Sequence, residues 1–588
     1  MAAQRAYTTH PLVVRRVTVR RIHEVTPRMR RIVVGGDGLG SITRDGVTHP
    51  PFAAPGFDDH LKLIFAADGD VHAALPAQLP HGIEWGPSEH RQARDYTPRR
   101  FDPVAGELDL DFVLHGDGPA AEWASRAGVG DELWFVGPKS SLKLPDELDW
   151  IVLIGDETAL PAIGRYLDER PHDAPAHVLV TVSHDEARQE LALRDGDTIA
   201  WVVAEPGDAE ALDAAVRAVE LPDGDGYAWA AAESRALLPV RRYLQRERGL
   251  AKDRVNITGY WHRESVADAS AAPGSDKTPA EAGEIPSPLP WLVTRAALQL
   301  GVIDAVADAP GMPVERLAER VGVASGTLAM LLPVLTAHGV LAEAADGELT
   351  LGPAGEELLD EHEREELDGP EADLLLALGG LASSIRAGES PWRTATGTTL
   401  AESARAERER FAHLVEESEQ LAFILDGLVA DPLVQRAETC LLTGPGAASV
   451  VAALEQSAVR PFLRVAEDDG PAAALRDAVE HPERLEWTAG PADLAIAARA
   501  LAHRTDGECV ELLSDLARWS ETAIVIEASR PDGLGAHTAE ASLLAFAATG
   551  SPLREASAIA ALAGAAGWRP ARVIPLGWGT EATVLERA

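Results

Sequence analysis

Cysteine is almost absent from this sequence of 588 residues, which contains only Cys440 and Cys509 and has no CxxC pair. A disulfide framework, a zinc ribbon or a cysteine-ligated iron–sulfur cluster would each need more thiols than these. We therefore expect a protein without structural disulfides, and the sequence indicates no bound metal ion.

Basic residues are also few relative to acidic ones. The chain has 53 lysines and arginines against 93 aspartates and glutamates, which gives a formal net charge of −40 at pH 7. General binding to nucleic acid or to an acidic membrane requires clustered positive charge. The composition therefore argues against both partners, although an acidic protein can still bind anionic ligands locally.

Long apolar runs are missing as well. No segment approaches the length that spans a bilayer, and the N-terminus lacks the apolar stretch of a secretory signal. The remaining composition, with 46% hydrophobic and 25% charged residues, is that of an ordinary soluble protein. These features predict a cytoplasmic location with no membrane partner.

The length of the chain predicts several domains, because 588 residues are too many for one hydrophobic core. The main boundary is predicted at residues 265–288, a segment rich in Ala, Pro, Ser and Gly that has no apolar period. Such a linker tethers two modules without fixing their orientation.

The two sides of this linker each divide again. Residues 1–145 carry short strand-like runs separated by Gly, Pro and Asp, which predicts a β-barrel, and residues 146–264 alternate strand and helix, which predicts a parallel α/β domain. Residues 289–436 have apolar residues at helical spacing and a short strand pair, which indicates a winged-helix unit. Residues 437–588 alternate strand and helix again and predict a second, Rossmann-like open α/β domain.

The segment RDYTPR, residues 94–99, has the residue types that a flavin-binding barrel needs. A tyrosine can lie against the isoalloxazine ring, a threonine can hydrogen-bond near its N5 atom, and an arginine can pair with a phosphate. The same six residues, taken alone, are equally compatible with an exposed strand and turn.

A second segment, FVLHGDGPAAEWA at residues 112–124, reads as a strand, a glycine-rich turn and a helix that begins near Pro119. Glycines let the backbone approach a phosphate closely, and the unpaired N–H groups at a helix start favour an anion. The loop GPKS at residues 137–140 follows a further strand and adds a cation.

A third segment, IVLIGDETALPA at residues 151–162, is an apolar strand that feeds a helix. It lacks the GxGxxG fingerprint of dinucleotide-binding folds. A strand-to-helix turn at the carboxyl end of a parallel sheet is nevertheless where such sheets bind ligands.

The ordered motifs RxYTxR, FVxHGxGPAxxWA, GPxxS, GDETALPA, WAAxES and GYWxR resemble the siderophore-interacting protein family, a branch of the ferredoxin-reductase-like flavoproteins. The resemblance covers about Val13 to Arg263. It implies FAD in the barrel and NADH or NADPH on the second domain, with the choice of nucleotide left open. The implied reaction is hydride transfer to the flavin, followed by reduction of a ferric siderophore and release of ferrous iron.

The resemblance also implies site residues of three kinds. Those that would hold FAD are Arg94, Tyr96, Thr97, His115, Gly118, Pro119, Ala120, Trp123, Gly137 and Ser140. Those on the nicotinamide side are Asp156, Glu157, Thr158, Ala159 and Glu233. The basic residues expected near the ferric substrate are Lys62, Arg241, Arg242 and Arg263, with the arginines of residues 15–31 behind them. A solvated strand or helix face is the simpler explanation for any single one of these basic residues.

Two positions depart from the family pattern. Ser140 and Ala232 stand where the family more often has glycine, and each is expected to add a side chain near a nucleotide.

The second half resembles small-molecule O-methyltransferases. Residues 289–359 are similar to the dimerisation and winged-helix region of that family, which implies a homodimer. The segment LAHRTDGEC places His503 where these enzymes carry a catalytic histidine, a possible general base for a hydroxyl proton. An ordinary surface histidine at a helix start is equally compatible with the sequence.

The expected S-adenosylmethionine site is degenerate. Its loop keeps Gly444 and Gly446, but a proline intrudes and the usual preceding acid is missing; Glu467 remains as a candidate for the ribose hydroxyls. We therefore expect a flavin reductase with a non-methylating module. Two alternatives remain: a bifunctional or repurposed tailoring enzyme of secondary metabolism, and a second half that serves only as a dimerisation scaffold.

Overall fold

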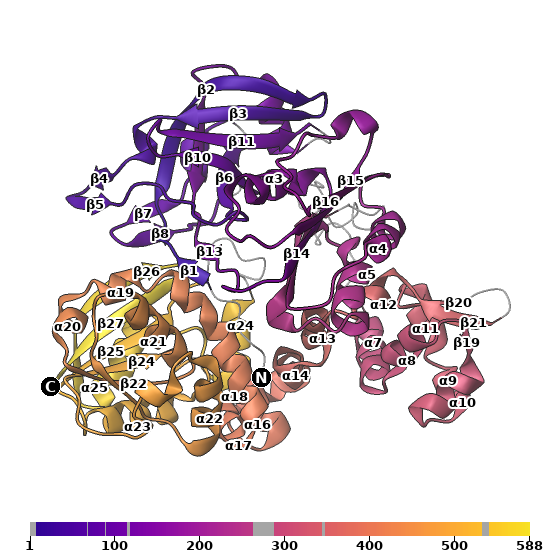
Figure 1. Ribbon diagram of the computed structural model, residues 1–588. Helices are drawn as coiled ribbons and strands as arrows, with labels where there is room; N and C mark the ends of the chain where they lie inside the picture. The colour runs from indigo at the N-terminus through magenta and orange to yellow at the C-terminus, as the bar shows by residue number, and fades with distance from the viewer. Residues whose placement is uncertain are drawn as a thin grey trace. The chain divides into compact units, whose positions relative to one another are not determined.

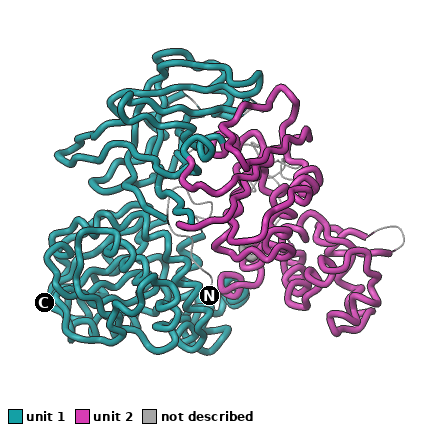
Figure 2. Tube along the Cα trace, in the orientation of Figure 1, with its two compact units in different colours: residues 1–145, 164–169, 374–588 teal, residues 146–163, 170–373 magenta. Residues whose placement is uncertain are grey.

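A computed structural model of the chain describes residues 7–67, 69–88, 90–114, 118–262, 287–343, 347–531 and 540–588. The chain divides into two compact units, coloured teal and magenta in Figure 2. Unit 1 consists of residues 1–145, 164–169 and 374–588, and unit 2 of residues 146–163 and 170–373. Most of the predicted linker lies outside the described residues.

The N-terminal part of unit 1 is a curled antiparallel sheet of seven strands in the order β10-β11-β3-β2-β12-β6-β9 (Figure 1). In chain order the strands are β2 (Val14–Thr26), β3 (Met29–Gly35), β6 (Leu61–Ala66), β9 (Arg91–Tyr96), β10 (Pro98–Asp102), β11 (Glu107–Val113) and β12 (Glu132–Val136). The edge strands β9 and β10 are consecutive and are separated only by Thr97, so the chain passes directly from one edge of the sheet to the other. The predicted barrel is therefore confirmed as a barrel-like, curled sheet.

Smaller elements surround this sheet. They are the hairpins β4 (Ile42–Arg44) with β5 (Val47–His49) and β7 (Ala77–Leu79) with β8 (Gly82–Glu84), the pair β1 (Tyr7–Thr9) with β13 (Ser140–Leu142), and the helices α1 (Val71–Ala74) and α2 (Pro119–Arg126). The barrel core is apolar; Ile32, Leu110 and Phe112 are fully buried in it, and Ala120 and Ala124 of α2 join them.

The arginines of β2 and β3 serve the barrel itself. The Arg31 guanidinium donates to both carboxylate oxygens of Asp111 at 2.6 and 2.8 Å. Arg15 is buried and donates to backbone carbonyls, among them that of Pro50 at 2.7 Å. The basic cluster expected behind the substrate residues is thus largely structural.

The C-terminal part of unit 1 is a six-stranded sheet in the order β23-β22-β24-β25-β27-β26. Its strands are β22 (Thr439–Thr443), β23 (Phe462–Val465), β24 (Leu494–Ala498), β25 (Thr522–Ala528), β26 (Trp568–Gly577) and β27 (Thr580–Arg587). The first four strands pair in parallel, and the closing hairpin β26–β27 is antiparallel. This is the open α/β, methyltransferase-like sheet that the sequence predicts.

Helices cover both faces of this second sheet. They are α21 (Ala447–Gln456), α22 (Asp469–Ala478), α23 (Asp506–Leu516) and α25 (Ala556–Ala565). A further helix, α24 (Ala541–Thr549), packs against the helix of residues 391–396. Successive strand residues join different cores: Leu442 packs with residues of α21, whereas Leu441 packs with residues of α23 and α25. Such alternation follows from the two-residue period of a strand and buries both faces of the sheet.

Short helices precede the second sheet within the same unit. They are α15 (Leu381–Ala387), α16 (Pro391–Thr396), α17 (Leu400–Ala406), α18 (Arg408–Glu417), the 3-10 helix η8 (Ser418–Phe423), α19 (Asp426–Val429) and α20 (Pro432–Arg436). Thr399 and Glu402 form a capping box that fixes the start of α17.

Unit 2 begins with a five-stranded parallel sheet in the order β16-β15-β14-β17-β18. Its strands are β14 (Trp150–Gly155), β15 (Ala176–Val182), β16 (Thr198–Val203), β17 (Gly226–Glu233) and β18 (Val255–Trp261). The chain leaves β14 for β15 on one side and returns to β17 on the other. The carboxyl ends of β14 and β17 therefore form a topological switch point, where open α/β sheets bind ligands.

Helices accompany this sheet and continue beyond it. The first set is α3 (Leu160–Glu169), α4 (Ala209–Ala218) and α5 (Leu237–Arg242). The second set is α7 (Leu289–Gln299), α8 (Val302–Asp308), α9 (Val314–Val321), α10 (Ser325–Leu328), α11 (Leu332–Ala337), α12 (Pro353–Glu357), α13 (Glu361–Asp368) and α14 (Pro370–Ala377). A small antiparallel sheet of β19 (Met312–Pro313), β21 (Glu348–Leu351) and β20 (Leu341–Glu343) accompanies the second set.

No single helix in the described part of the chain is long and apolar enough to cross a membrane. Two sharply bent helix pairs, α7 with α8 and α9 with the helices up to Ala337, meet the same length and composition test.

Candidate cofactor sites

The RDYTPR segment contains the connection between the two edge strands of the curled sheet, β9 and β10. Tyr96 ends β9, its ring centroid lies 4.5 Å from that of Phe112, and Thr97 is buried between the two edge strands. Burial raises the pKa of the Tyr96 phenol, and the neighbouring Arg94 charge opposes that shift. Arg94 is exposed, and its guanidinium donates to the Ala93 carbonyl at 2.8 Å. The three predicted flavin residues of this segment therefore share one edge of the barrel.

The helix α2 presents an open N-terminus in the same barrel. Gly118 is its N-cap residue, has an extended backbone and makes no side-chain capping bond. Among the described residues, a β-carbon added to Gly118 would meet no atom within 4 Å. The first backbone N–H groups of a helix have no intrahelical partner, and such groups favour an anion.

An aromatic cluster connects the two segments. Trp123 of α2 lies 5.6 Å from Phe112, the ring that also contacts Tyr96, and 6.1 Å from Phe65. Pro119 begins the helix and Ala120 packs into the core. His115 lies outside the described residues.

The loop of residues 137–140 is the third predicted part of the flavin site. Gly137 has a φ of +106°, and a β-carbon there would lie 3.3 Å from the His60 carbonyl oxygen, so this conformation favours glycine. Ser140 is buried and begins β13. Burial lowers the pKa of the Lys139 ammonium, while the charge of Asp95 raises it and that of Lys62 lowers it further.

Lys62 lies beside this loop but is already ion-paired. Its ammonium donates to both carboxylate oxygens of Asp95 at 2.9 and 3.1 Å, in a partly exposed setting. An exposed pair of this kind contributes little to stability, so an anionic ligand can exchange with the carboxylate at low energetic cost.

In unit 2, Asp156 organises the turn after β14. Its carboxylate accepts hydrogen bonds from the Thr158 backbone and hydroxyl at 2.8 and 2.5 Å. The other carboxylate oxygen accepts from the Trp261 indole at 2.7 Å and from the Glu233 backbone at 3.2 Å. Asp156 thus ties together the ends of β14, β17 and β18 at the switch point.

Glu157 and Glu233 are held just as firmly. Glu157 is buried, and one carboxylate oxygen accepts from the Ser183 backbone and hydroxyl at 2.8 and 2.5 Å. Glu233 is also buried and accepts from the Ala236 backbone at 2.8 Å. Ala159 lies so close to Gly155 that a β-carbon on this glycine would come within 2.3 Å of the alanine methyl group.

Ala232 is one of the two departures from the family pattern. It packs in the hydrophobic core with Ala228 and Ala230, because alternate residues of β17 face the same side of the sheet. Its methyl group therefore fills core volume, and the effect of this alanine on a bound nucleotide stays a prediction.

The basic residues of α5 are ion-paired with an acidic stretch of unit 2. Arg241 pairs with Asp360, and Arg242 lies 3.7 Å from Glu356. The nearby Arg235 pairs with Glu357 at 2.6 Å. These partners lie more than a hundred residues away in the chain, so no local pattern predicts them. Arg263 lies outside the described residues.

The glycine loop of the second half is tightly enclosed. Gly444 has a φ of +93°, and a β-carbon there would lie 2.4 Å from the Ala498 carbonyl oxygen. A β-carbon on Gly446 would lie 2.6 Å from the Leu421 side chain and 3.0 Å from the Ala498 methyl group. These glycines allow close packing of the loop against β24 and η8.

Glu467 is hydrogen-bonded to the same loop. One of its carboxylate oxygens accepts from the Thr443 hydroxyl at 2.7 Å and from the Gly444 backbone at 2.6 Å. The acid predicted for the ribose hydroxyls is therefore hydrogen-bonded to the loop itself.

His503 is buried, so the prediction that allowed a surface histidine is wrong. Burial and the charges of Arg504 and Arg405 hold its pKa well below the ordinary value, and the ring is therefore neutral at pH 7. Its Nε2 atom lies 2.9 Å from the Arg504 guanidinium.

Sequence reasoning missed two buried partners of this region. Glu527, at the end of β25, accepts from the Leu501 backbone at 2.6 Å, and burial raises its pKa. Arg554 donates to the carbonyls of Leu501 and Arg504 at 2.8 and 2.7 Å. The glutamate inside the apolar run AIVIEA was the available signal for the first of them.

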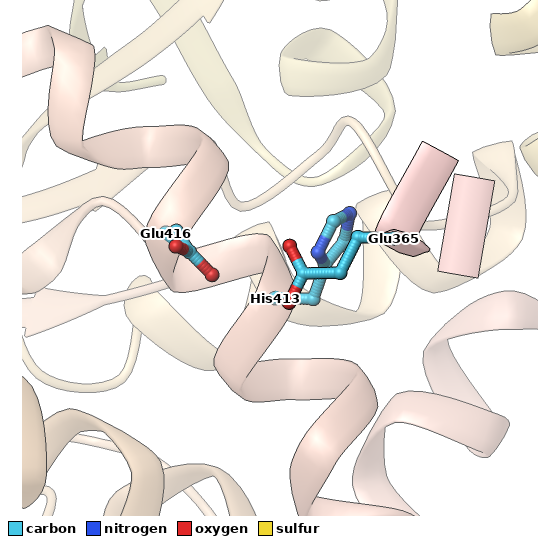
Figure 3. A group of neighbouring side chains, drawn as sticks. All are labelled: Glu365, His413 and Glu416. Carbon is cyan, nitrogen blue, oxygen red and sulfur yellow. The ribbon is translucent and has the colours of Figure 1, made fainter. Parts of the chain in front are cut away.

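A group of three possible metal-ligating residues is drawn in Figure 3. His413 and Glu416 both belong to α18 of unit 1, and His413 lies 3.5 Å from Glu417 on the same helix. Glu365 belongs to α13 of unit 2. The group is divided between the two units, and we assign no metal centre to it.

Comparison with known proteins connects the first half to one family. The siderophore-interacting FAD-binding domain matches residues 18–142, and the siderophore-interacting protein domain matches residues 148–264. The NADPH-dependent ferric-chelate reductase of Escherichia coli is 33% identical over 251 residues, which is 42% of this chain and 92% of that protein.

Solved structures resemble each half. A siderophore utilization protein from T. fusca is 36% identical, with a TM-score of 0.40, over 45% of this chain and 97% of that one. The mitomycin 7-O-methyltransferase is 23% identical, with a TM-score of 0.40, over 55% of this chain and 100% of that one.

Proposed function

Because the first half of this chain belongs to the siderophore-interacting protein family, we propose that the protein is an FAD-dependent NAD(P)H oxidoreductase that reduces a ferric siderophore and releases ferrous iron. The observation that carries the proposal is the convergence of the Arg94–Thr97 segment and the open start of α2 on one aromatic cluster of the barrel. The reductase relative from E. coli is described as acting on a ferric chelate with NADPH.

The barrel residues fit FAD. Gly118 leaves space at the start of α2, where the backbone N–H groups suit a diphosphate. Tyr96 is held in place by Phe112, and the exposed Arg94 has a guanidinium that suits a phosphate. When bound, FAD supplies hydride acceptance from a reduced nicotinamide and electron delivery to ferric iron. The task of the chain is to hold the cofactor and to position both partners.

On the nicotinamide side, the switch-point residues supply a rigid frame. Asp156 fixes the turn through four hydrogen bonds, and Glu157 and Glu233 are each fixed by backbone donors. A preorganised turn loses little entropy when a ligand binds. This supports the proposal that the turn binds NADH or NADPH, with Thr158 and Ala159 at the contact.

The substrate residues we propose are basic. Lys62, Arg241 and Arg242 each have a carboxylate partner in a partly exposed setting, and an anionic ferric chelate can compete for such cations. Arg263 joins them on the basis of the family motif GYWxR. Lys62 gains support from its electrostatic link to Lys139 of the predicted flavin loop.

For the second half we propose a non-methylating module. Leu421 and Ala498 fill the space beside Gly446, and Glu467 occupies the N–H group of Gly444. A methyltransferase fold whose glycine loop is enclosed in this way has lost the opening through which S-adenosylmethionine would approach the backbone. His503 would then contribute to a buried polar cluster and not to proton transfer.

We also propose a homodimer formed through a winged-helix region in residues 289–359. Exposed apolar side chains on this region, namely Leu289, Leu292, Leu300 and Met330, support such an interface. A cytoplasmic location without nucleic-acid or membrane partners agrees with the net charge of −40.

The proposed reaction can be tested under nitrogen with the full chain, FAD, NADPH or NADH, and ferric tris-catecholate or tris-hydroxamate chelates. A chromogenic ferrous chelator should report ferrous iron that depends on both FAD and the nicotinamide nucleotide. NADPH oxidation in air without ferrous iron under nitrogen would overturn the proposal. The exposed pair of Arg100 with Asp102 lies outside the predicted site, so Arg100→Ala provides a matched control.

A further inference from the structure

The C-terminal sheet and the barrel are joined by specific contacts inside unit 1. Glu84, at the end of β8, accepts from the Gly579 backbone at 3.0 Å and from the Arg530 guanidinium at 2.8 Å. Arg530 also donates to Glu581 of β27 at 3.0 Å. One barrel carboxylate thus binds both the turn of the β26–β27 hairpin and the loop that follows β25.

The backbones at this contact approach each other closely. A β-carbon on Gly577, which has a φ of +111°, would lie 2.4 Å from the Ile83 carbonyl oxygen. A β-carbon on Gly82 would lie 3.1 Å from the Leu576 carbonyl oxygen. Glycine at positions 82 and 577 allows this close approach, because a side chain at either position would push the β7–β8 and β26–β27 hairpins apart.

Apolar packing completes the contact. Trp578, in the turn of the C-terminal hairpin, packs against a barrel cluster that includes Ile83, Trp85 and Val136. Val136 is the last residue of β12 and directly precedes the loop of residues 137–140. The interface therefore reaches the predicted flavin loop.

A second contact touches that loop itself. The Lys139 ammonium lies 4.7 Å from the centroid of the Phe423 ring, a cation–π geometry. Phe423 in turn lies 6.1 Å from Trp578, so both contacts belong to one continuous surface.

The segment that carries Phe423 is the one that fills the glycine loop. Phe423 ends η8, and Leu421 of the same turn packs against Gly446. The Ser449 hydroxyl of α21 donates to the Ser418 carbonyl at 3.0 Å and fixes the other end of η8. The helix η8 thus carries both Leu421, which packs against the loop of residues 442–448, and Phe423, which contacts Lys139.

We propose that the C-terminal α/β domain is a permanent structural part of the flavin site: it docks on the β7–β8 hairpin and braces the loop of residues 137–140 through Phe423. The docking is independent of the proposed function, whereas the effect on flavin rests on it. The linker of residues 265–288 was predicted to leave the orientation of the two halves free. The proposed docking would instead fix the C-terminal α/β domain on the β7–β8 hairpin.

The docking can be tested in the full chain with a protease site inserted after residue 275. After cleavage of the folded protein, the two fragments should co-elute from a sizing column at micromolar concentration. A double variant, Glu84→Ala with Trp578→Ala, should weaken their association at least tenfold. Arg569→Ala removes an exposed pair with Glu586 at the far end of the same hairpin and should leave it unchanged. The pairs of Arg241 with Asp360 and of Arg242 with Glu356 also cross the cut, so the docking is measured by the difference between the unaltered protein and the double variant. Separation of the unaltered fragments, or an unchanged association in the double variant, would overturn the proposal.

The bracing of the loop can be tested with Phe423→Leu, which keeps an apolar side chain but removes the ring under Lys139. The dissociation constant of FAD should rise severalfold, while the cleaved fragments still co-elute. Phe462→Leu, an exposed ring on β23, is the matched control. Unchanged FAD affinity in Phe423→Leu would overturn the bracing role. Failure of the unaltered chain to bind FAD would instead refute the proposed function, because co-elution needs no flavin.

Discussion

Two glycine-containing turns lead into helices within unit 1, and their surroundings are opposite. At the start of α2, a β-carbon on Gly118 would meet no atom of the described residues within 4 Å. At the start of α21, a β-carbon on Gly446 would lie 2.6 Å from Leu421, and the Gly444 backbone already donates to Glu467. The first turn can receive an anion, whereas the second is occupied by its own protein.

The difference shows that glycine content alone does not identify a ligand-binding loop. Glycine permits close approach, but the approaching group can be a phosphate or another part of the chain. What decides between them is the side chain opposite the turn, here Leu421, and whether an acid has taken the N–H group of the loop, as Glu467 has.

The largest difference in stability is expected when a methyl group is added to the enclosed turn and, for comparison, to the turn at the start of α2. Gly444→Ala should destabilise the fold by about 3 kcal/mol, because it combines overpacking against Ala498 with a positive φ. Gly118→Ala should change stability by less than about 0.5 kcal/mol. Thermal unfolding of both variants measures the contrast, and equal losses would show that the two turns are equally enclosed.

Arg94 is the second proposed phosphate contact of the barrel, and its removal should weaken FAD binding. Loss of one charge-assisted hydrogen bond corresponds to roughly 1.5–3 kcal/mol, so Arg94→Ala should raise the dissociation constant of FAD about 10- to 100-fold. Flavin fluorescence titration gives the value. Arg100→Ala should bind as the unaltered chain does, and an equal effect in both variants would assign Arg94 to the surface.

A smaller effect is expected at the switch point of unit 2. Asp156→Asn removes one acceptor from the Thr158 and Trp261 hydrogen bonds, and kcat/KM for NADPH should fall roughly tenfold while flavin content stays constant. Asp185→Asn, at a surface pair with Arg188, is the control. Loss of flavin from Asp156→Asn would mean that this turn does not act separately from the barrel.

The smallest effect is expected on the pH dependence of stability, through the buried His503 of the C-terminal α/β domain. His503 has a lowered pKa when folded, so the unfolded chain binds its proton more readily below the ordinary value of 6.5. The contribution of His503 to stability should therefore be lost as pH falls from 7 to 5, by at most about 1.4 kcal/mol per pH unit. The melting temperature of His503→Gln should fall less over this range. An identical pH dependence in both proteins would indicate an exposed or paired histidine.

The barrel-like sheet and both α/β sheets could be predicted from the sequence, because strand alternation and motif order are local properties. The alignment of Arg94, Tyr96 and Thr97 along one barrel edge follows from their adjacency in the chain. Phe112 and Trp123 could be predicted as apolar residues, but the contacts of Phe112 with Tyr96 and with Trp123 depend on how the sheet curls.

The packing of Leu421 against the glycine loop of the second half could not be predicted in the same way. The sequence showed the altered loop of residues 442–448, but Leu421 precedes that loop by more than twenty residues and carries no motif. The ion pairs of Arg241 and Arg242 are equally non-local. The sequence left His503 open between a general base and a surface histidine at a helix start, whereas the folded chain buries it beside Phe411 and near the charges of Arg504 and Arg405.

One pair of calorimetric titrations tests the contrast between the two turns most directly: FAD and S-adenosylhomocysteine, each added separately to the full-length apoprotein. The account predicts that FAD binds with a micromolar or tighter dissociation constant and that S-adenosylhomocysteine produces no binding heat. Micromolar binding of S-adenosylhomocysteine would show that the loop of residues 442–448 still opens to its cofactor and would contradict the account.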